Sequence, residues 1–400
     1  MEVGPNVREL QSSATMAVSA LAKALKAQGR DIIDLGAGEP DFRTPDFAAQ
    51  AGIASIVQGF THYTDPAGLP RLREAIAGQL ATRSQRPVDA AGVVVSTGAK
   101  QALFNAMFTL FGPGDEVLVP GPFWTSYPEQ VKLARATPVV VPTTLEDHFK
   151  VTPDHLQRAT TERTRGLLLN SPSNPTGAVY EHAELEALLR WAAERGIWVI
   201  SDEIYGRLVY DMDTAPSVLD FEDGLLERVV LVDGPSKAFA MTGWRVGFSY
   251  CAPALAATFS ALQSHVTSGA AAASQYAALA AYSDEPRVAH ALQAMVEVFR
   301  RRRDRVVEQF ERLLPEAAFS KPAGAFYQFF RIASYFADGR TGSVSFCRWL
   351  LETSGLAVVP GEAFGMDDYA RLSFAAADED INEGIRRLAE AVSPGQTVRS

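Results

Sequence analysis

Cysteine and histidine are both scarce in this chain of 400 residues. Cys251 and Cys347 are the only cysteines, too few for a disulfide framework, so we interpret them as core thiols of a protein in a reducing compartment. The six histidines include no pair at the spacing of metal ligands. The sequence therefore predicts neither a disulfide scaffold nor a bound metal.

Long hydrophobic runs are absent as well. The first six residues have neither the basic segment nor the apolar segment of a signal peptide. The alanine-rich stretch 253–282 is interrupted by Gln263, His265 and Ser268, which favours packed helix over a membrane span. We therefore expect a soluble, cytoplasmic protein with no membrane partner.

Two common catalytic signatures are missing. Gly36-Ala37-Gly38 follows an apolar run, but Glu39-Pro40 comes next in place of a third glycine and a helix start, which excludes a dinucleotide-binding fingerprint. No Gly-x-Ser-x-Gly segment is present, which removes the usual α/β-hydrolase interpretation.

Positive charge is in the minority, with 37 Lys and Arg against 47 Asp and Glu and a net charge of −10. That balance disfavours a nucleic-acid partner. A run of four arginines at 300–303 lies in a long helix predicted to begin near residue 288, and we interpret the run as a solvated helix face. The chain length and a hydrophobic content of 47% indicate two domains that share one interface.

Strand-like and helix-like segments alternate, as a mostly parallel sheet flanked by helices requires. Residues 181–195 carry leucines at helical spacing. Segments 324–327 and 356–361 are typical of strands in a smaller α+β domain. The apolar strand candidates of the large sheet are residues 93–95, 116–119, 137–141, 166–169, 197–200 and 229–232.

The segment around Lys237 carries the strongest indication of chemistry. Lys237 follows the predicted strand 229–232, at the strand end where α/β sheets place reactive groups. Ser236 precedes it, and Arg245 follows eight positions later. An amine can bond an aldehyde, while a hydroxyl and a guanidinium can hold a phosphate. The combination suits a lysine Schiff base beside a phosphate.

Two further segments occur upstream, Asn-Ser-Pro-Ser-Asn-Pro-Thr-Gly at 170–177 and Ser-Asp-Glu-Ile-Tyr at 201–205. With them, the chain resembles the class I pyridoxal-phosphate (PLP) aminotransferases over nearly its whole length, and bacterial aspartate aminotransferases most. The resemblance implies the fold type I architecture, in which a large domain has a mostly parallel seven-stranded sheet between helices and a smaller domain is α+β. We place the large, PLP-binding domain at 46–287. The small domain would combine 1–45 with 288–400.

The resemblance also assigns catalytic roles. Lys237 is the covalent anchor of PLP, as an aldimine, and carries protons between the substrate Cα and the cofactor. Asp202 keeps the pyridine nitrogen protonated, while Tyr205 and Asn174 donate hydrogen bonds to the phenolate oxygen. In relatives the peptide bond before the residue matching Pro175 is often cis.

Other positions match residues that bind the cofactor or the substrate. A glycine turn before a helix offers backbone N–H groups to phosphate. Trp124 matches the aromatic ring that stacks on the pyridine. Arg371 matches the arginine that holds the substrate α-carboxylate through two parallel hydrogen bonds, with the backbone of Gly38 closing over it. The phosphate-binding set is Gly98, Ala99, Lys100, Ser236, Arg245 and Tyr63, with Tyr63 supplied by the neighbouring subunit of a homodimer.

The substrate rests on fewer residues. Lys100 matches a lysine that pairs with the distal carboxylate of dicarboxylic substrates, although it could instead be a solvated lysine near the phosphate. Residues 12–15 resemble a segment that lies over the substrate side chain, and Thr15 is a possible hydrogen-bond partner. Members that accept prephenate carry a basic residue where this chain has Gln11. The substrate-binding set is then Thr15, Gly38, Lys100, Trp124, Asn174 and Arg371.

We therefore expect an aspartate aminotransferase that converts L-aspartate and 2-oxoglutarate into oxaloacetate and L-glutamate by a ping-pong route. The same fold also supports aromatic, prephenate or broad-range aminotransferases and PLP carbon–sulfur lyases. A transcriptional regulator with this fold would need a DNA-binding domain ahead of it, and we expect none from the short segment before the first motif.

Overall fold

The computed structural model of the chain describes residues 4, 7–8, 10, 14–283, 285–337 and 339–393. A seven-stranded sheet in the order β2-β8-β7-β6-β5-β3-β4 forms its larger part. β8 (Gly247–Tyr250) is antiparallel to both of its neighbours, and the other adjacent pairs are parallel, which confirms the expected architecture. The other strands are β2 (Val93–Ser96), β3 (Glu116–Pro120), β4 (Thr137–Val141), β5 (Thr164–Asn170), β6 (Trp198–Asp202) and β7 (Val229–Asp233).

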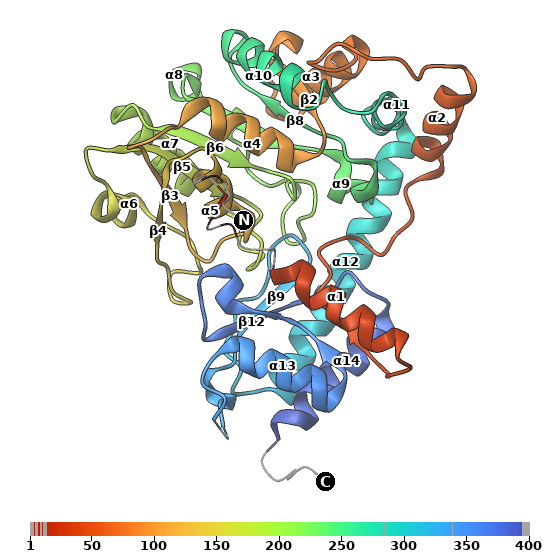
Figure 1. Ribbon diagram of the computed structural model, residues 1–400, viewed down its shortest axis with the longest axis vertical. Helices are drawn as coiled ribbons and strands as arrows, with labels where there is room; N and C mark the ends of the chain where they lie inside the picture. The colour runs from red at the N-terminus through yellow and green to blue at the C-terminus, as the bar shows by residue number, and fades with distance from the viewer. Residues whose placement is uncertain are drawn as a thin grey trace.

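Helices cover both faces of this sheet (Figure 1), so central strands such as β3 and β7 are largely continuous apolar runs. In β5, Leu167 and Leu169 belong to one core, while Leu168 between them belongs to the core on the opposite face. The first core includes α3 (Pro70–Ser84), α6 (Pro153–Ala159) and α7 (His182–Glu194). The second includes α4 (Ala99–Leu110), α5 (Ser126–Leu133) and α10 (Pro253–Val266).

A smaller group of strands is built from both ends of the described chain. β9 (Tyr327–Arg331), β12 (Tyr369–Ser373) and β11 (Val359–Pro360) form an antiparallel sheet, and β1 (Ile33–Asp34) pairs in parallel with β10 (Leu356–Ala357). The helices beside them are α1 (Ala14–Ala27), α13 (Ser343–Ser354) and α14 (Asp378–Val392), at the lower end of Figure 1. The N-terminal segment therefore packs with the C-terminal part.

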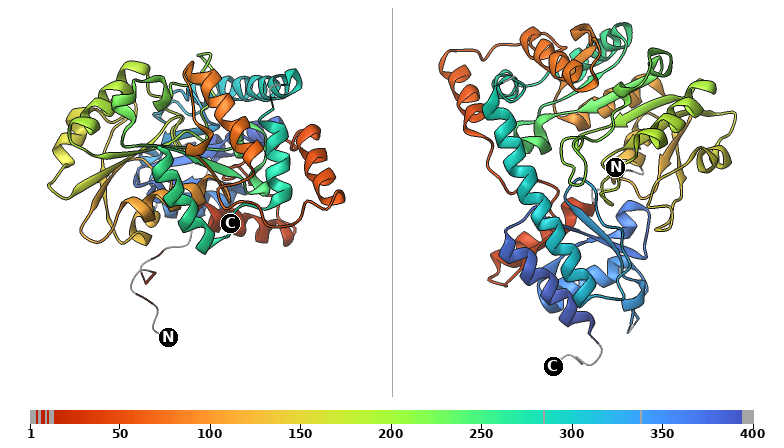
Figure 2. Two further views of the ribbon diagram at one scale, coloured as in Figure 1. Left: turned by 90° about the horizontal axis from the view of Figure 1, so that it is seen from above. Right: turned by 180° about the vertical axis from the view of Figure 1, so that it is seen from behind.

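The long helix α12 (Pro286–Leu313) joins the two groups of strands (Figure 2). It begins two residues before position 288, so the predicted boundary there falls inside its first turn. The domain limits 46–287, 1–45 and 288–400 stay a prediction. The remaining helices are α2 (Asp46–Val57), α8 (Asp223–Leu226), α9 (Pro235–Ala238) and α11 (Ala272–Ala281).

Two details of the sequence interpretation are wrong. The third and fourth arginines of the run at 300–303 are buried: Arg302 pairs with Asp41 and Asp378, and Arg303 pairs with Asp211. A run of four residues passes once round a helix, so part of it must face inward. The strand predicted at 324–327 begins only at Tyr327.

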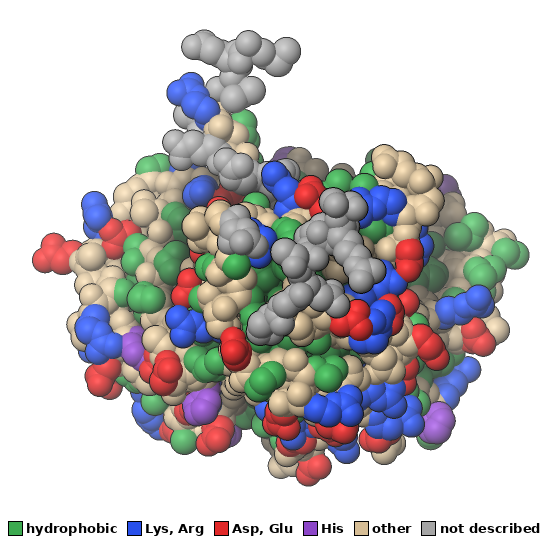
Figure 3. All heavy atoms as spheres, turned by 90° about the horizontal axis from the view of Figure 1, so that it is seen from below, with side chains coloured by type: hydrophobic (Ala, Val, Ile, Leu, Met, Phe, Trp, Pro, Cys, Tyr) green, Lys and Arg blue, Asp and Glu red, His purple; other side chains and the backbone are tan. Residues whose placement is uncertain are grey.

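The surface carries both basic and acidic side chains, as expected from a chain with 37 Lys and Arg and 47 Asp and Glu. Figure 3 views the end of the molecule where α13 and α14 lie, and basic and acidic side chains are interspersed there. On α14, for example, Arg386 pairs with Glu383 at 2.6 Å and also with Glu390. Within the described ranges, no helix is both long enough and apolar enough to cross a membrane.

Candidate active site

A cavity of about 610 Å³ lies at the carboxyl ends of β5, β6 and β7. Parallel sheets bind ligands at this edge. Asn170 and Asp202 are the last residues of β5 and β6, and Lys237 follows β7 in the short helix α9. Arg371 in β12 and Tyr327 in β9 line the cavity from the smaller sheet. The cavity therefore takes side chains from both sheets.

Most of the predicted site residues meet here. Gly98 adjoins the cavity, because a Cβ atom at that position would lie 2.5 Å from Arg245 Nη2. Tyr63 does not reach it within one chain, since its side chain is 93% exposed. Thr15 belongs to α1, but its side chain is outside the described part, as are Gln11 and Ser12. The predicted residues that line the cavity are Gly38, Ala99, Lys100, Trp124, Asn174, Asp202, Tyr205, Ser236, Lys237, Arg245 and Arg371.

Lys237 points into the cavity, and its Nζ donates a hydrogen bond to the carbonyl oxygen of Gly38 at 2.6 Å. Burial lowers the pKa of Lys237 to about 8; Glu39 opposes this shift, and the cations Arg245 and Arg371 add to it. A neutral amine is the form that attacks an aldehyde or accepts a proton. Lys237 is thus unusually ready for both roles near neutral pH.

Asp202 is buried at the end of β6 and held from two sides. Tyr127 donates its hydroxyl to Oδ2 at 2.7 Å, and the backbone N–H of Ile204 lies 3.1 Å from Oδ1. Burial raises the pKa of Asp202 to about 6, although these two hydrogen bonds oppose the shift. The carboxylate is therefore mostly ionised at pH 7, and a cation beside it would be stabilised.

Tyr205 and Asn174 are linked to the smaller sheet. The hydroxyl of Tyr205 lies 2.7 Å from that of Tyr327, and burial, with Tyr327 beside it, raises the pKa of Tyr205 well above its ordinary value. Asn174 Oδ1 accepts a hydrogen bond from Arg371 Nη1 at 2.9 Å. The peptide bond between Asn174 and Pro175 is cis.

Arg371 is only 1% exposed, and two of its three nitrogens have partners. Nη1 donates to Asn174, and Nη2 donates to the carbonyl of Gly36 at 2.7 Å. The guanidinium lies 4.3 Å from the ring centroid of Tyr327. Its Nε has no acceptor among the described residues. A buried guanidinium with an unpaired N–H can bind an anion strongly, and a substrate carboxylate would be such a partner.

A second group of residues in and beside the cavity offers donors for an anion. Helix α4 begins at Ala99 with Gly98 as its N-cap, and no side chain caps it, so its first N–H groups are available. Arg245 is close enough to Gly98 that only glycine fits there without a shift. Ser236 lines the same region. This arrangement suits a phosphate group.

Lys100 extends along the cavity wall, with its Nζ 4.7 Å from the ring centroid of Trp124. Burial, with a smaller contribution from Arg245, lowers the pKa of Lys100. Trp124 also packs edge-on against Tyr127 at 5.3 Å between ring centroids. Lys100 as a whole is exposed, so its place in the site rests on its position in the cavity lining and on its contact with Trp124.

Several lining residues were not predicted. Tyr127 stands in the same aromatic segment as Trp124, three positions further on, so its neighbourhood to Trp124 could have suggested it as a site residue. Tyr327 meets Tyr205 across 122 positions of sequence, so no local pattern could reveal it. Asp34, at the end of β1, was also missed. Asn170, whose Nδ2 donates to the Asp202 carbonyl at 3.0 Å, opens the motif at 170–177, which was a local signal for it.

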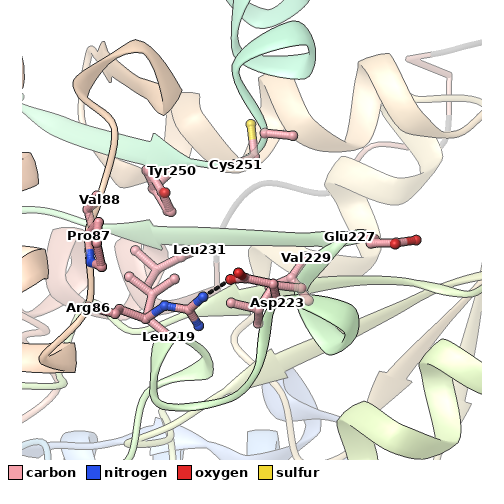
Figure 4. Close-up of a pocket in the computed structure, with 12 residues that line it drawn as sticks. Arg86, Pro87, Val88, Leu219, Asp223, Glu227, Val229, Leu231, Tyr250 and Cys251 are labelled. Atoms are coloured by element: carbon pink, nitrogen blue, oxygen red, sulfur yellow. Dashed lines mark ion pairs between the residues drawn. The ribbon is translucent and has the colours of Figure 1, made fainter.

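A second cavity, of about 190 Å³, lies beside β7 and β8 (Figure 4). Its one arginine, Arg86, forms an ion pair with Asp223 and donates to the carbonyl of Phe221. Burial raises the pKa of its thiol, Cys251, to about 12, so that group is unreactive at neutral pH. None of the predicted site residues lines it.

Comparison of the sequence with known proteins identifies its family. The sequence profile described as "Aminotransferase class I and II" matches residues 30–390. The chain is 42% identical to an aspartate aminotransferase of Streptomyces avermitilis, covering 98% of this chain and 96% of that one. It is 41% identical to a probable aspartate/prephenate aminotransferase of Aquifex aeolicus, covering 96% and 97%.

Solved structures agree. An aspartate aminotransferase of Thermus thermophilus, determined with maleate, superimposes with a TM-score of 0.92 at 37% identity and covers 98% of this chain and 99% of its own. The enzyme of Thermotoga maritima gives 0.90 at 40% identity, with coverage of 98% and 100%. Because the profile spans the site and the relatives match along nearly their whole length, this chain belongs to the class I and II aminotransferases.

Proposed function

We propose that this protein moves the amino group of L-aspartate to 2-oxoglutarate, giving oxaloacetate and L-glutamate. The observation that carries the proposal is the convergence of Lys237, Asp202 and Arg371 in one cavity, with an unpaired N–H on the arginine. Relatives at about 40% identity that are named aspartate aminotransferases support the choice of substrate.

The residues fit the cofactor of the family. Aminotransferases of this class use PLP, and we propose that Lys237 Nζ carries it. The start of α4, Ser236 and Arg245 would hold the phosphate, and Asp202 would face the pyridine nitrogen. Bound there, PLP supplies an electron sink for the pair left when the substrate Cα loses its proton.

The protein's own groups would do the rest. Lys237, with its lowered pKa, would accept the Cα proton and return it. Arg371 would bind the α-carboxylate and fix the orientation of the Cα–H bond. Tyr205 and Asn174 would donate hydrogen bonds to the ring oxygen of the cofactor. Trp124 would cover the ring face.

Lys100 would select dicarboxylic substrates. It lines the same cavity as Arg371, so one substrate could bring a carboxylate to each cation. Because Lys100 is exposed, such a charge-assisted contact would be only partly shielded from water. Thr15 stays a predicted contact to the substrate side chain.

We further propose that the active protein is a homodimer. Around Tyr63, helix α2 and the following turn expose Ile53, Ile56, Val57 and Phe60. Contiguous exposed apolar surface of this kind marks an interface. A second copy covering this face would bring its own Tyr63 to the phosphate end of the cavity.

The test is a spectrum of the purified protein during addition of single amino acids. Loss of the band of the lysine-bound cofactor with L-aspartate, and its return with 2-oxoglutarate, is expected. A response to aromatic amino acids alone would redirect the substrate, and release of pyruvate and ammonia without an acceptor would indicate a lyase. Lys237→Ala should lack both the band and turnover, and near-normal turnover in this variant would contradict the assignment.

A further inference from the structure

The segment from Asp34 to Gly38 contributes to the cavity lining, and two of its backbone carbonyls accept hydrogen bonds from cations of the site. Gly36 O accepts from Arg371 Nη2 at 2.7 Å, and Gly38 O accepts from Lys237 Nζ at 2.6 Å. The position of Arg371 therefore depends on the path of this short segment. Asn174, the other partner of Arg371, comes from a different loop.

Asp34 fixes the path of that segment from inside. Its Oδ1 accepts the backbone N–H of Gly36 at 2.8 Å, a turn closed by an aspartate side chain two residues back. The contact is tight, because a Cβ atom on Gly36 would lie only 3.2 Å from the same Oδ1. Asp34 itself is anchored by the pairing of β1 with β10, in register with Ala357.

Asp34 also lines the substrate cavity, where its charge acts on Arg371. Among the described residues its carboxylate makes no ion pair, and the side-chain hydrogen bond that it forms there is the one to Gly36. A carboxylate beside the binding place of another carboxylate is unfavourable by itself. The presence of Asp34 is therefore best explained by the hydrogen bond that its Oδ1 accepts from Gly36.

We propose that Asp34 is a positioning residue: its carboxylate oxygen closes the turn at Gly36, and that turn presents the carbonyl that orients Arg371 for the substrate α-carboxylate. The chain of contacts runs from Asp34 Oδ1 to Gly36 N–H, and from Gly36 O to Arg371 Nη2. The substrate would meet Arg371 and not Asp34. The inference rests on the proposed function only in requiring an amino acid whose α-carboxylate Arg371 binds.

The test compares Asp34→Asn, which keeps an acceptor oxygen and removes the charge, with Asp34→Ala, which removes both. Asp34→Ala should raise KM about fivefold for every accepted amino acid, with a smaller change in kcat, because one hydrogen bond that orients the arginine is lost. Asp34→Asn should stay within about twofold of the wild type. Maleate, a dicarboxylate without an amino group, should lose affinity in parallel when its binding is followed through the cofactor spectrum.

Asp31→Ala is the matched control. Asp31 lies three residues upstream, does not line the cavity and pairs with Arg387, so its loss should leave KM unchanged. Should Asp34→Ala fail to fold, Asp34→Leu keeps the branched shape of the side chain and lacks the acceptor. An unchanged KM in the acceptor-free variant overturns the proposal, as does an Asp34→Asn variant that is equally impaired. If the wild type uses another amino acid in place of aspartate, the assigned substrate fails while Asp34 is still tested with that amino acid.

Discussion

At the residue scale, the site depends on a lysine whose surroundings change its protonation. Lys237 has a pKa lowered to about 8 from an ordinary 10.5, because burial disfavours its charge. In cofactor-free protein the neutral, reactive fraction should fall about tenfold for each pH unit below pH 8 and level off above it. The rate at which added PLP develops its lysine-bound absorbance should follow this curve.

A lysine with the ordinary pKa of 10.5 would behave differently. The rate at which it attaches PLP would keep rising up to about pH 10.5. A rate that continues to climb by tenfold per unit beyond pH 9 would show that Lys237 is not buried in the cofactor-free protein. Free lysine measured at each pH supplies the control for the chemistry of PLP itself.

Lys100 is tested by the difference between substrates. Lys100→Ala should lower kcat/KM for L-aspartate and L-glutamate more than kcat/KM for L-alanine. The expected difference is ~1–3 kcal/mol, the size of a charge-assisted contact. Lys132→Ala is the control, because Lys132 pairs with Glu129 on α5 and does not line the cavity. An equal loss for all three amino acids would mean that Lys100 serves the phosphate end and not the distal carboxylate.

These residues also show how far sequence reasoning reaches into the site. Lys237, Asp202, Asn174 and Arg371 stand in recognisable local motifs, and the structure brings all four to one cavity. Contacts between distant segments have no local pattern. The hydroxyl pair of Tyr205 and Tyr327 and the hydrogen bond from Arg371 to the Gly36 carbonyl join segments far apart in the chain, which composition and spacing do not encode.

At the scale of elements, the expectation drawn from the sequence for α12 is wrong, because part of its arginine run is buried and not solvated. Arg303 is 1% exposed and forms two hydrogen bonds of 2.8 Å to Asp211 and one of 2.7 Å to the Pro322 carbonyl. Arg303→Ala should lower the free energy of unfolding by ~2–3 kcal/mol, since it leaves a buried carbonyl unpaired and a void. The midpoint of urea unfolding measures this loss.

The exposed Arg301 on the same helix provides the comparison. Arg301→Ala removes a charge from solvent and should change stability by less than ~0.5 kcal/mol. Equal effects of the two substitutions would mean that the contacts of Arg303 contribute nothing beyond a surface charge.

The strands divide into those that sequence could find and those that it could not. The parallel strands are buried on both faces, so β3, β6 and β7 are visible as apolar runs. β8 has the composition Gly-Phe-Ser-Tyr, and only its antiparallel pairing between β2 and β7 makes it a strand. Likewise, β1 and β10 are two residues each and exist through their pairing with one another.

At the scale of the whole molecule, the proposed role of Tyr63 in the site of a neighbouring subunit predicts that a single chain is incomplete as a catalyst. The side chain of Tyr63 is 93% exposed beside the apolar face of α2. Light scattering should therefore find a dimer, and Val57→Glu should weaken both the dimer and cofactor retention, because it places a charge on that face. Val344→Glu, at an exposed valine on α13, should do neither.

A shared site also predicts complementation between two inactive variants. Lys237→Ala and Tyr63→Ala, each of low activity alone, should regain activity when unfolded together and refolded, or when co-expressed. In a mixed dimer, one site would combine the intact Lys237 of one subunit with the intact Tyr63 of the other. Random mixing would restore about a quarter of the sites, because half of the dimers are mixed and each has one complete site. If the mixture gains nothing while mixed dimers are shown to form, Tyr63 acts within its own subunit or not at all, and the shared site is excluded.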